Sequence, residues 1–288
     1  MIRLFAFTLA IAFSSGFYDS AFCADTKPVS LQEALNKGLI QVATKGLGDH
    51  HGQCIEISIT SLNKKEMEIT IDAGLQLFPD DTSVQSMIVT QERMFALTPK
   101  AIRKIKLFAM CTEQSDRGPA ADELFALGPM ADGNLLEVVN FLSKKKYQTS
   151  AAQHAVWCIT DSASIGGIYD ETNPALAKEL RMLVAKLTGK IPPWYQVEYK
   201  IQPGVQETFE PLRIHADFKY TLTEEGVVTF AIFNERGDTV QTILANHQEK
   251  AGMHGMKIKF ESRNLPKVKY YARVTNKGIL IEEQVFEL

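Results

Sequence analysis

Residues 149–161 read Thr-Ser-Ala-Ala-Gln-His-Ala-Val-Trp-Cys-Ile-Thr-Asp and lie where a strand-rich first part of the chain meets a helical segment. Ser150 and Gln153 have the spacing of a capping box, in which Ser150 caps a helix and the Gln153 side chain reaches back to the cap. Apolar residues follow at helical spacing, and Trp157 is the largest of them. We therefore expect a short buried helix, anchored by Ser150 and Trp157, with Cys158 as a small apolar filler.

The same stretch resembles a known motif. The string Gln153-His-Ala-Val-Trp157 is similar to the Thr-Gln-x-Ala-Ile-Trp motif of bacterial surface thioester domains, with Ala152 in place of the threonine. In that family the glutamine side chain condenses with a cysteine from an earlier strand, and the internal thioester captures a nucleophile on a host surface. The resemblance implies a thioester between Gln153 and either Cys111 or Cys54.

The first residues have the features of a secretory signal peptide, which we expect to span residues 1–24. Arg3 supplies a positive charge, and residues 4–13 form an apolar run that is too short to cross a bilayer. Small residues within 21–23 then provide a cleavage site before Ala24. We expect a protein exported by a bacterium, either secreted or located in the periplasm or at the outer surface.

Composition is that of an ordinary folded protein, with 45% hydrophobic and 23% charged residues in 288. This length suggests two domains once the signal peptide is removed. The net charge of −3 and the lack of a basic stripe argue against a nucleic-acid partner. After the signal peptide, no apolar run is long enough for a transmembrane helix.

Three cysteines remain after cleavage, namely Cys54, Cys111 and Cys158. In an oxidising compartment we expect one disulfide and one buried thiol. The sequence leaves the pairing open. We favour a disulfide between Cys111 and Cys158, because it ties the helical part to the strand part.

Metal-ligand residue types occur in the segment 49–54, which reads Asp-His-His-Gly-Gln-Cys. We expect a polar loop here, because adjacent histidines in a strand point in different directions and no second cluster with zinc spacing follows. The alternative is a metal site, for which His154 and Cys158 offer another half-site. We predict no bound metal and no cofactor.

The first domain, residues 25–190, is predicted to combine strands and helices. A helix is expected over 30–47, with Ser30 as its cap. Several short strands over 54–110 follow and form a small β-sandwich, and the alternation over 55–59 predicts the first of them. Residues 112–131 contain two Gly-Pro pairs and are expected to be turns. A helical subdomain is expected over 132–188, and its last helix is predicted to begin with Asn173 as the cap and Pro174 at the first position.

The second domain is predicted to be an all-β sandwich over residues 212–288, preceded by a connector over 191–211. Residues 194–201 of this connector are alternatively an edge strand. The sandwich resembles the immunoglobulin-like domain of flagellar hook-capping proteins and of C-terminal modules in secreted Bacteroidetes proteins. Five strings carry that resemblance: Phe218-Lys-Tyr-Thr-Leu, Gly226-Val-Val-Thr-Phe-Ala-Ile-Phe-Asn, Gly237-Asp-Thr-Val, Ala251-Gly-Met-His and Tyr270-Tyr-Ala-Arg. The predicted fold class is therefore α+β, with an N-terminal β-sandwich-like sheet, a packed helical subdomain and a C-terminal immunoglobulin-like sandwich.

No sequence motif indicates an enzyme. Gly-x-Ser-x-Gly, the phosphate-binding glycine loop and His-Glu-x-x-His are all missing from the sequence. We expect a secreted binding or envelope-associated protein without catalytic activity, whose partner is an extracellular protein or a carbohydrate. The alternatives are an adhesin with the Cys–Gln thioester and a secreted hydrolase with its site on the loops of residues 112–131.

Overall fold

The computed structural model describes residues 27–200 and 210–288. The expected signal peptide lies outside the described residues. The chain folds as an α+β protein of several β-sheets and a few helices, so the predicted fold class is confirmed.

The N-terminal unit is built on a closed barrel with the strand order β2-β3-β8-β6-β5-β9. Strict alternation in the sequence explains strand β3, since Ile55, Ile57 and Ile59 are completely buried while the residues between them are partly exposed. The barrel strands are β2 (Ile40–Leu47), β3 (His51–Ser61), β5 (Leu75–Pro79), β6 (Met87–Val89), β8 (Ile102–Cys111) and β9 (Ala121–Met130).

A small second sheet shares the core of the barrel, and the short first helix α1 (Leu31–Asn36) contacts two of its strands. As predicted, Ser30 caps α1, and its hydroxyl accepts a hydrogen bond from the Glu33 N–H at 3.1 Å. This sheet has the strand order β1-β4-β7, with β1 (Val29–Ser30), β4 (Met67–Ile71) and β7 (Arg93–Leu97).

Two segments of the N-terminal unit differ from the prediction. The helix expected over 30–47 ends at Asn36, because Gly38 adopts a left-handed backbone (φ +64°) and the chain then turns into β2. The turns expected over 112–131 extend only to residue 120. Residues 121–130 form β9, which closes the barrel by pairing with both β2 and β5.

The helical subdomain consists of α2 (Gly133–Lys145), α3 (Ser150–Thr160), the short 3-10 helix η1 (Ile165–Gly167) and α4 (Pro174–Thr188). Helix α4 begins as predicted, with Asn173 as the cap and Pro174 at its first position. Buried residues of all three α-helices share one apolar cluster, which also takes in Ile88 and Met110 of the barrel strands. The helices are therefore packed onto the barrel.

The C-terminal unit is a sandwich of two antiparallel sheets, β10-β11-β14 and β13-β12-β15-β16, with one shared core. Strand β10 pairs with β11, so the interpretation of residues 194–201 as an edge strand is confirmed for its described part. The strands are β10 (Tyr195–Lys200), β11 (Glu210–Leu222), β12 (Gly226–Phe233), β13 (Thr239–Glu249), β14 (Gly252–Glu261), β15 (Lys269–Asn276) and β16 (Ile279–Glu287).

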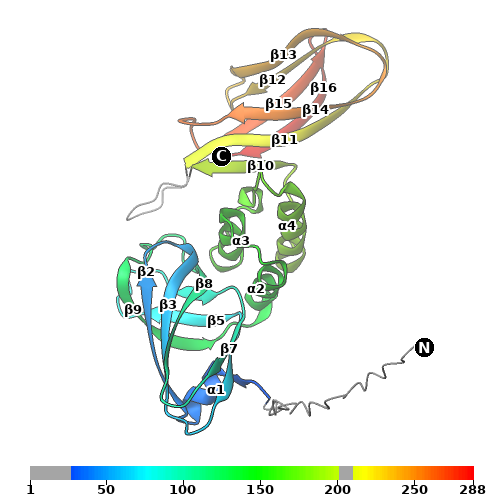
Figure 1. The fold of residues 1–288 in the computed structure, drawn as a ribbon. Coiled ribbons are helices and arrows are strands. Elements are labelled where there is room, and N and C mark those ends of the chain that lie inside the picture. Colours follow the sequence, from blue (N-terminus) through cyan, green and yellow to red (C-terminus); the bar gives the residue numbers. More distant parts are fainter. Residues whose placement is uncertain (1–26, 201–209) are drawn as a thin grey trace, which may run out of the picture.

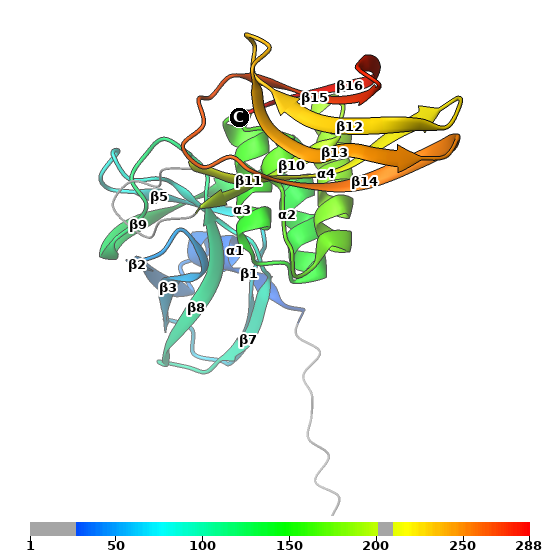
Figure 2. The ribbon, with the colours of Figure 1, turned by 90° about the horizontal axis from the view of Figure 1, so that it is seen from above.

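The three parts follow one another in space in the order barrel, helices and sandwich (Figure 1). Helix α3 lies between β8 of the barrel and β10 of the sandwich, and the view from above shows the same arrangement (Figure 2). The segment singled out in the sequence therefore lies at the junction of all three parts.

Candidate functional site

Helix α3 is buried over most of its length, from Ala151 to Cys158. Trp157 packs into the barrel core, whereas the small residues of α3 pack against α2 and α4. Two polar side chains of α3 are also buried, namely Gln153 (1% exposed) and His154 (4% exposed). Buried polar groups are stable only when hydrogen-bonded, so their partners define the site.

The Gln153 carboxamide lies directly against the backbone of Cys111. Its Oε1 accepts a hydrogen bond from the Cys111 N–H at 2.9 Å, and its Nε2 donates one to the Cys111 carbonyl at 2.8 Å. Cys111 is the last residue of β8, where the same N–H also approaches the His50 carbonyl at 3.1 Å. The Gln153 side chain therefore pairs with the backbone of β8 at Cys111, one residue beyond the last residue of β8 that pairs with β3.

The capping box expected between Ser150 and Gln153 is wrong. Thr149 occupies the cap position and Ser150 is the first helical residue. The Gln153 side chain cannot reach back to the helix start because Cys111 holds both of its polar atoms. The other predicted anchor, Trp157, is among the largest fully buried side chains.

The disulfide predicted between Cys111 and Cys158 is also wrong, since no disulfide joins them in the described part of the chain. The Cys111 thiol lies 3.3 Å from the Met87 sulfur, and the Cys158 thiol points to the Ser164 carbonyl oxygen at 3.6 Å. Cys158 follows Gln153 by five positions, which turns it by about 140° around the helix, away from the barrel.

Of the cysteines suggested as thioester partners, the structure places Cys111 and not Cys54 against Gln153. The Cys54 thiol is turned toward the Ala109 carbonyl at 3.4 Å. Burial raises the pKa of the Cys54 thiol to about 12, and burial raises the pKa of the Cys158 thiol to about 12 as well. Both are therefore protonated and weakly nucleophilic at neutral pH.

His154 joins α3 to the sandwich. Its Nε2 lies 2.8 Å from the Ser164 carbonyl, and its ring stacks on Tyr199 of β10 with centroids 5.5 Å apart. Gly167 packs so closely that a Cβ at this position would lie 2.2 Å from the His154 Nε2. The sequence does not indicate that Tyr199 and Gly167 contact His154, because this contact depends on how β10 and η1 pack against α3.

We expect His154 to make the protein sensitive to acid. Burial lowers the pKa of His154 to about 4, so as the pH falls the unfolded chain takes up this proton before the folded chain does. The contribution of the neutral ring is complete above pH 6.5 and is lost as the pH falls to about 4, for a total of about 3 kcal/mol. Urea unfolding at a series of pH values, compared with His154→Gln, measures the difference. Parallel pH profiles for the two proteins would contradict the expectation.

A further histidine, His50, lies beside Trp157, and His51 lies against His50. The His50 ring is stacked on the indole at 6.3 Å with an angle of 11° between the planes, and it also contacts the His51 ring. The sequence singled out these residues as ligand types but not their position, which is set by the turn between β2 and β3.

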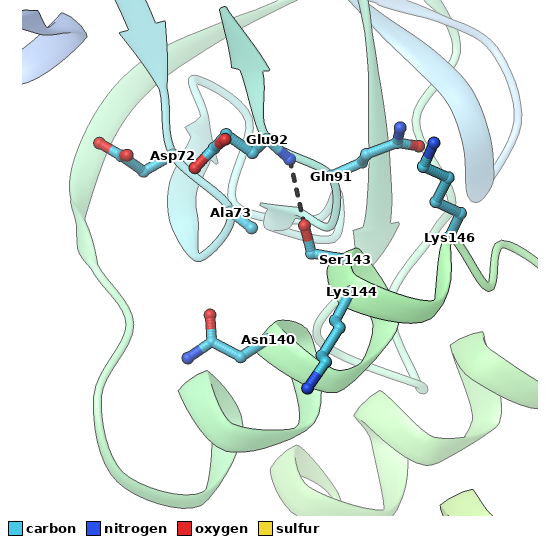
Figure 3. A pocket seen from close by; sticks show the side chains of 8 residues that line it. All are labelled: Asp72, Ala73, Gln91, Glu92, Asn140, Ser143, Lys144 and Lys146. Atoms are coloured by element: carbon cyan, nitrogen blue, oxygen red, sulfur yellow. Dashed lines mark hydrogen bonds between the residues drawn. The ribbon is translucent and has the colours of Figure 1, made fainter. Parts of the chain in front are cut away.

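A separate cavity of about 460 Å³ lies where the β4–β5 and β6–β7 connections meet the end of α2 (Figure 3). Its lining is polar, and Figure 3 shows the carboxylates of Asp72 and Glu92 across from Asn140 and Lys144. The Glu92 N–H donates to the Ser143 hydroxyl at 3.3 Å. The lining offers no aromatic platform, and it shares no residue with the cluster around α3.

The sequence matches no known protein family and no curated protein. A solved structure of the CBM51-2 and INT domains of ZmpB from Clostridium perfringens, in complex with GlcNAc, is 10% identical, with 86% of this chain and 79% of that chain covered. Its TM-score of 0.18 is too low to support an argument about fold or ligand. In the described residues, no helix has the length and apolar character needed to cross a membrane.

Proposed function

We propose that this chain is a secreted or envelope-associated bacterial protein that captures a partner covalently through a thioester between Cys111 and Gln153. The observation that carries the proposal is the pair of hydrogen bonds, 2.9 and 2.8 Å, that hold the Gln153 carboxamide against Cys111. These residues are 42 positions apart in the sequence. The resemblance of the α3 stretch to thioester domains names the same glutamine.

The chemistry requires no cofactor. The Cys111 sulfur attacks the Cδ carbon of Gln153, the C–N bond of the carboxamide breaks, and the thiol proton leaves with the nitrogen as ammonia. A nucleophile such as the amine of a partner then attacks the thioester carbonyl, forms an amide and releases the Cys111 thiol. Each protein molecule reacts once with its partner, so the reaction is not catalytic.

Two features of the site suit this reaction. The Cys111 N–H points at the Gln153 Oε1, the atom on which negative charge develops during attack. Both residues are almost fully buried, at 0% and 1% exposure, which protects a thioester from hydrolysis by bulk water.

The second candidate is a binding protein that acts without a covalent bond. The observation in its favour is that the Gln153 bonds also satisfy the backbone of Cys111 at the end of β8, which is a purely structural role. In this case the partner, an extracellular protein or a carbohydrate, binds elsewhere. The C-terminal sandwich, with its resemblance to immunoglobulin-like modules, is then the place to search.

The intact mass of the purified chain, combined with alkylation in denaturant without reductant, separates the candidates. Ammonia loss lowers the mass by about 17 Da and leaves two of the three thiols after Ala24 open to alkylation. A structural glutamine leaves the mass unchanged and all three thiols reactive. A disulfide lowers the mass by about 2 Da and leaves one thiol.

Matched cysteine variants assign the bond. The mass deficit of about 17 Da, which corresponds to one ammonia, is expected to disappear in Cys111→Ala. It is expected to persist in Cys54→Ala and in Cys158→Ala. Methylamine treatment is expected to open the thioester and leave an N-methyl amide at Gln153, so that the mass ends about 14 Da above that of the unmodified chain. A full set of three reactive thiols in the wild-type chain would refute the covalent proposal.

A further inference from the structure

Three residues with metal-binding side chains adjoin in the turn that leads into β3, namely Asp49, His50 and His51. Each offers one ligand atom, and these atoms all lie within 4.8 Å of one another. The closest pair is His50 Nε2 and His51 Nδ1 at 3.0 Å, whereas the Asp49 carboxylate lies nearest to the other ring nitrogen of His50, Nδ1, at 3.6 Å. The side chains thus converge, contrary to the expectation that adjacent histidines point apart.

The backbone explains this convergence. Asp49 adopts a left-handed conformation (φ +89°), and Gly48 and Gly52 on either side have φ of +80° and +84°. Such a conformation is uncommon for a residue other than glycine, although Asp adopts it more readily than most. These angles form a tight turn before β3, and next to it the His50 and His51 rings lie 4.4 Å apart between centroids.

We propose that Asp49, His50 and His51 bind one divalent transition-metal ion, such as Zn²⁺ or Cu²⁺. Imidazole nitrogen and carboxylate oxygen are the ligands these ions accept. Two ligand atoms on a tetrahedral ion with bonds of about 2.0–2.1 Å lie about 3.3 Å apart, close to the 3.0 Å between the two histidine nitrogens. Asp49 is 70% exposed in its side chain, so its carboxylate can rotate to complete the set.

Three protein ligands leave one position on the ion for water or for a group of a partner. The ion would lie next to the thioester candidate, because the His50 carbonyl accepts from the Cys111 N–H at 3.1 Å. Metal binding itself does not depend on a thioester, so it is expected in Cys111→Ala as in the wild-type chain.

The stacking of His50 on Trp157 provides a local readout. The chain has two tryptophans, and only Trp157 stacks on this cluster among the described ring contacts, while Trp194 packs in the sandwich. Cu²⁺ quenches the fluorescence of a nearby indole. Titration of the tag-free chain with CuSO₄ is therefore expected to give saturable quenching with one ion per chain. In Trp157→Phe the remaining Trp194 emission is expected to stay unquenched.

Substitutions test the ligands. His51→Ala, at a half-buried position, is expected to weaken Cu²⁺ binding about 100-fold, and Asp49→Ala at least about 10-fold. His247→Ala is the matched control, because it removes an exposed histidine of β13 and should change nothing. Zn²⁺ is expected to bind in calorimetry with the same stoichiometry and the same dependence on His51. Cu²⁺ affinity that is unchanged in His51→Ala, or quenching that persists in Trp157→Phe, would overturn the proposal.

Discussion

Replacing Trp157 with alanine is expected to lower the free energy of unfolding by about 3–5 kcal/mol. The indole is 1% exposed and belongs to the barrel core, although it is carried by a helix of the other subdomain. Its removal therefore opens a cavity where two hydrophobic clusters meet. It also removes the surface on which His50 stacks and against which the His154 ring packs edge-on.

Urea unfolding followed by far-ultraviolet circular dichroism measures this loss without relying on the fluorescence of the deleted residue. Met182→Ala on α4 is the control, because that side chain is 54% exposed and its loss should cost less than about 0.5 kcal/mol. The loss of unfolding free energy in Trp157→Phe is expected to lie between those of Trp157→Ala and Met182→Ala. If Trp157→Ala lowers the free energy of unfolding by less than about 1 kcal/mol, as a surface substitution does, then α3 does not couple the barrel to the helices.

The Gln153→Glu substitution is expected to destabilise the protein by about 3–5 kcal/mol at pH 7–8. The new carboxylate has almost the shape of the amide but loses the Nε2 donor, so an anionic oxygen faces the Cys111 carbonyl in a buried site. Burial raises the pKa of such a carboxyl group, and its protonated form can again donate a hydrogen bond. The difference from the wild-type chain should therefore shrink as the pH falls toward 4–5, roughly where a carboxyl group titrates.

Gln41→Glu is the matched control for this substitution, because Gln41 is exposed on β2 and the same chemical change there should be nearly neutral. Gln153→Glu also tests the covalent proposal independently of stability, since it lacks the amide nitrogen that leaves as ammonia. A Gln153→Glu protein as stable as Gln41→Glu would show that the bonds to Cys111 contribute little.

Several elements were predictable because their signals are local. The caps at Ser30 and Asn173 depend on residues within one turn, and both occur as expected. The alternation around Ile55–Ile59 defined β3, and the strong alternating runs after residue 212 defined the sandwich. Each of these patterns is satisfied by burial of one face, whatever the partner.

Other elements depended on partners distant in the sequence. Residues 40–47 fit an amphipathic helix, but Gly38 ends α1 and the segment instead pairs with β3 and β9. Residues 121–130 look like turns because of the Gly128-Pro129 pair, yet they complete the barrel. Closure satisfies the backbone of both edge strands, a gain that no local pattern records.

The candidate site likewise has features that are local in the sequence and features that depend on distant partners. The sequence by itself determined that the α3 stretch is a helix with a buried tryptophan, and it singled out Gln153 as the residue with chemical potential. Only the tertiary structure decided that Gln153 contacts Cys111, that Cys158 faces Ser164, and that His50 and His51 converge beside Trp157. The physical reason is that the direction of each side chain is set by packing and by backbone angles in elements far apart in the chain. Spacing along the sequence gives the angle between two side chains of one helix, but it does not give the neighbour that each side chain meets.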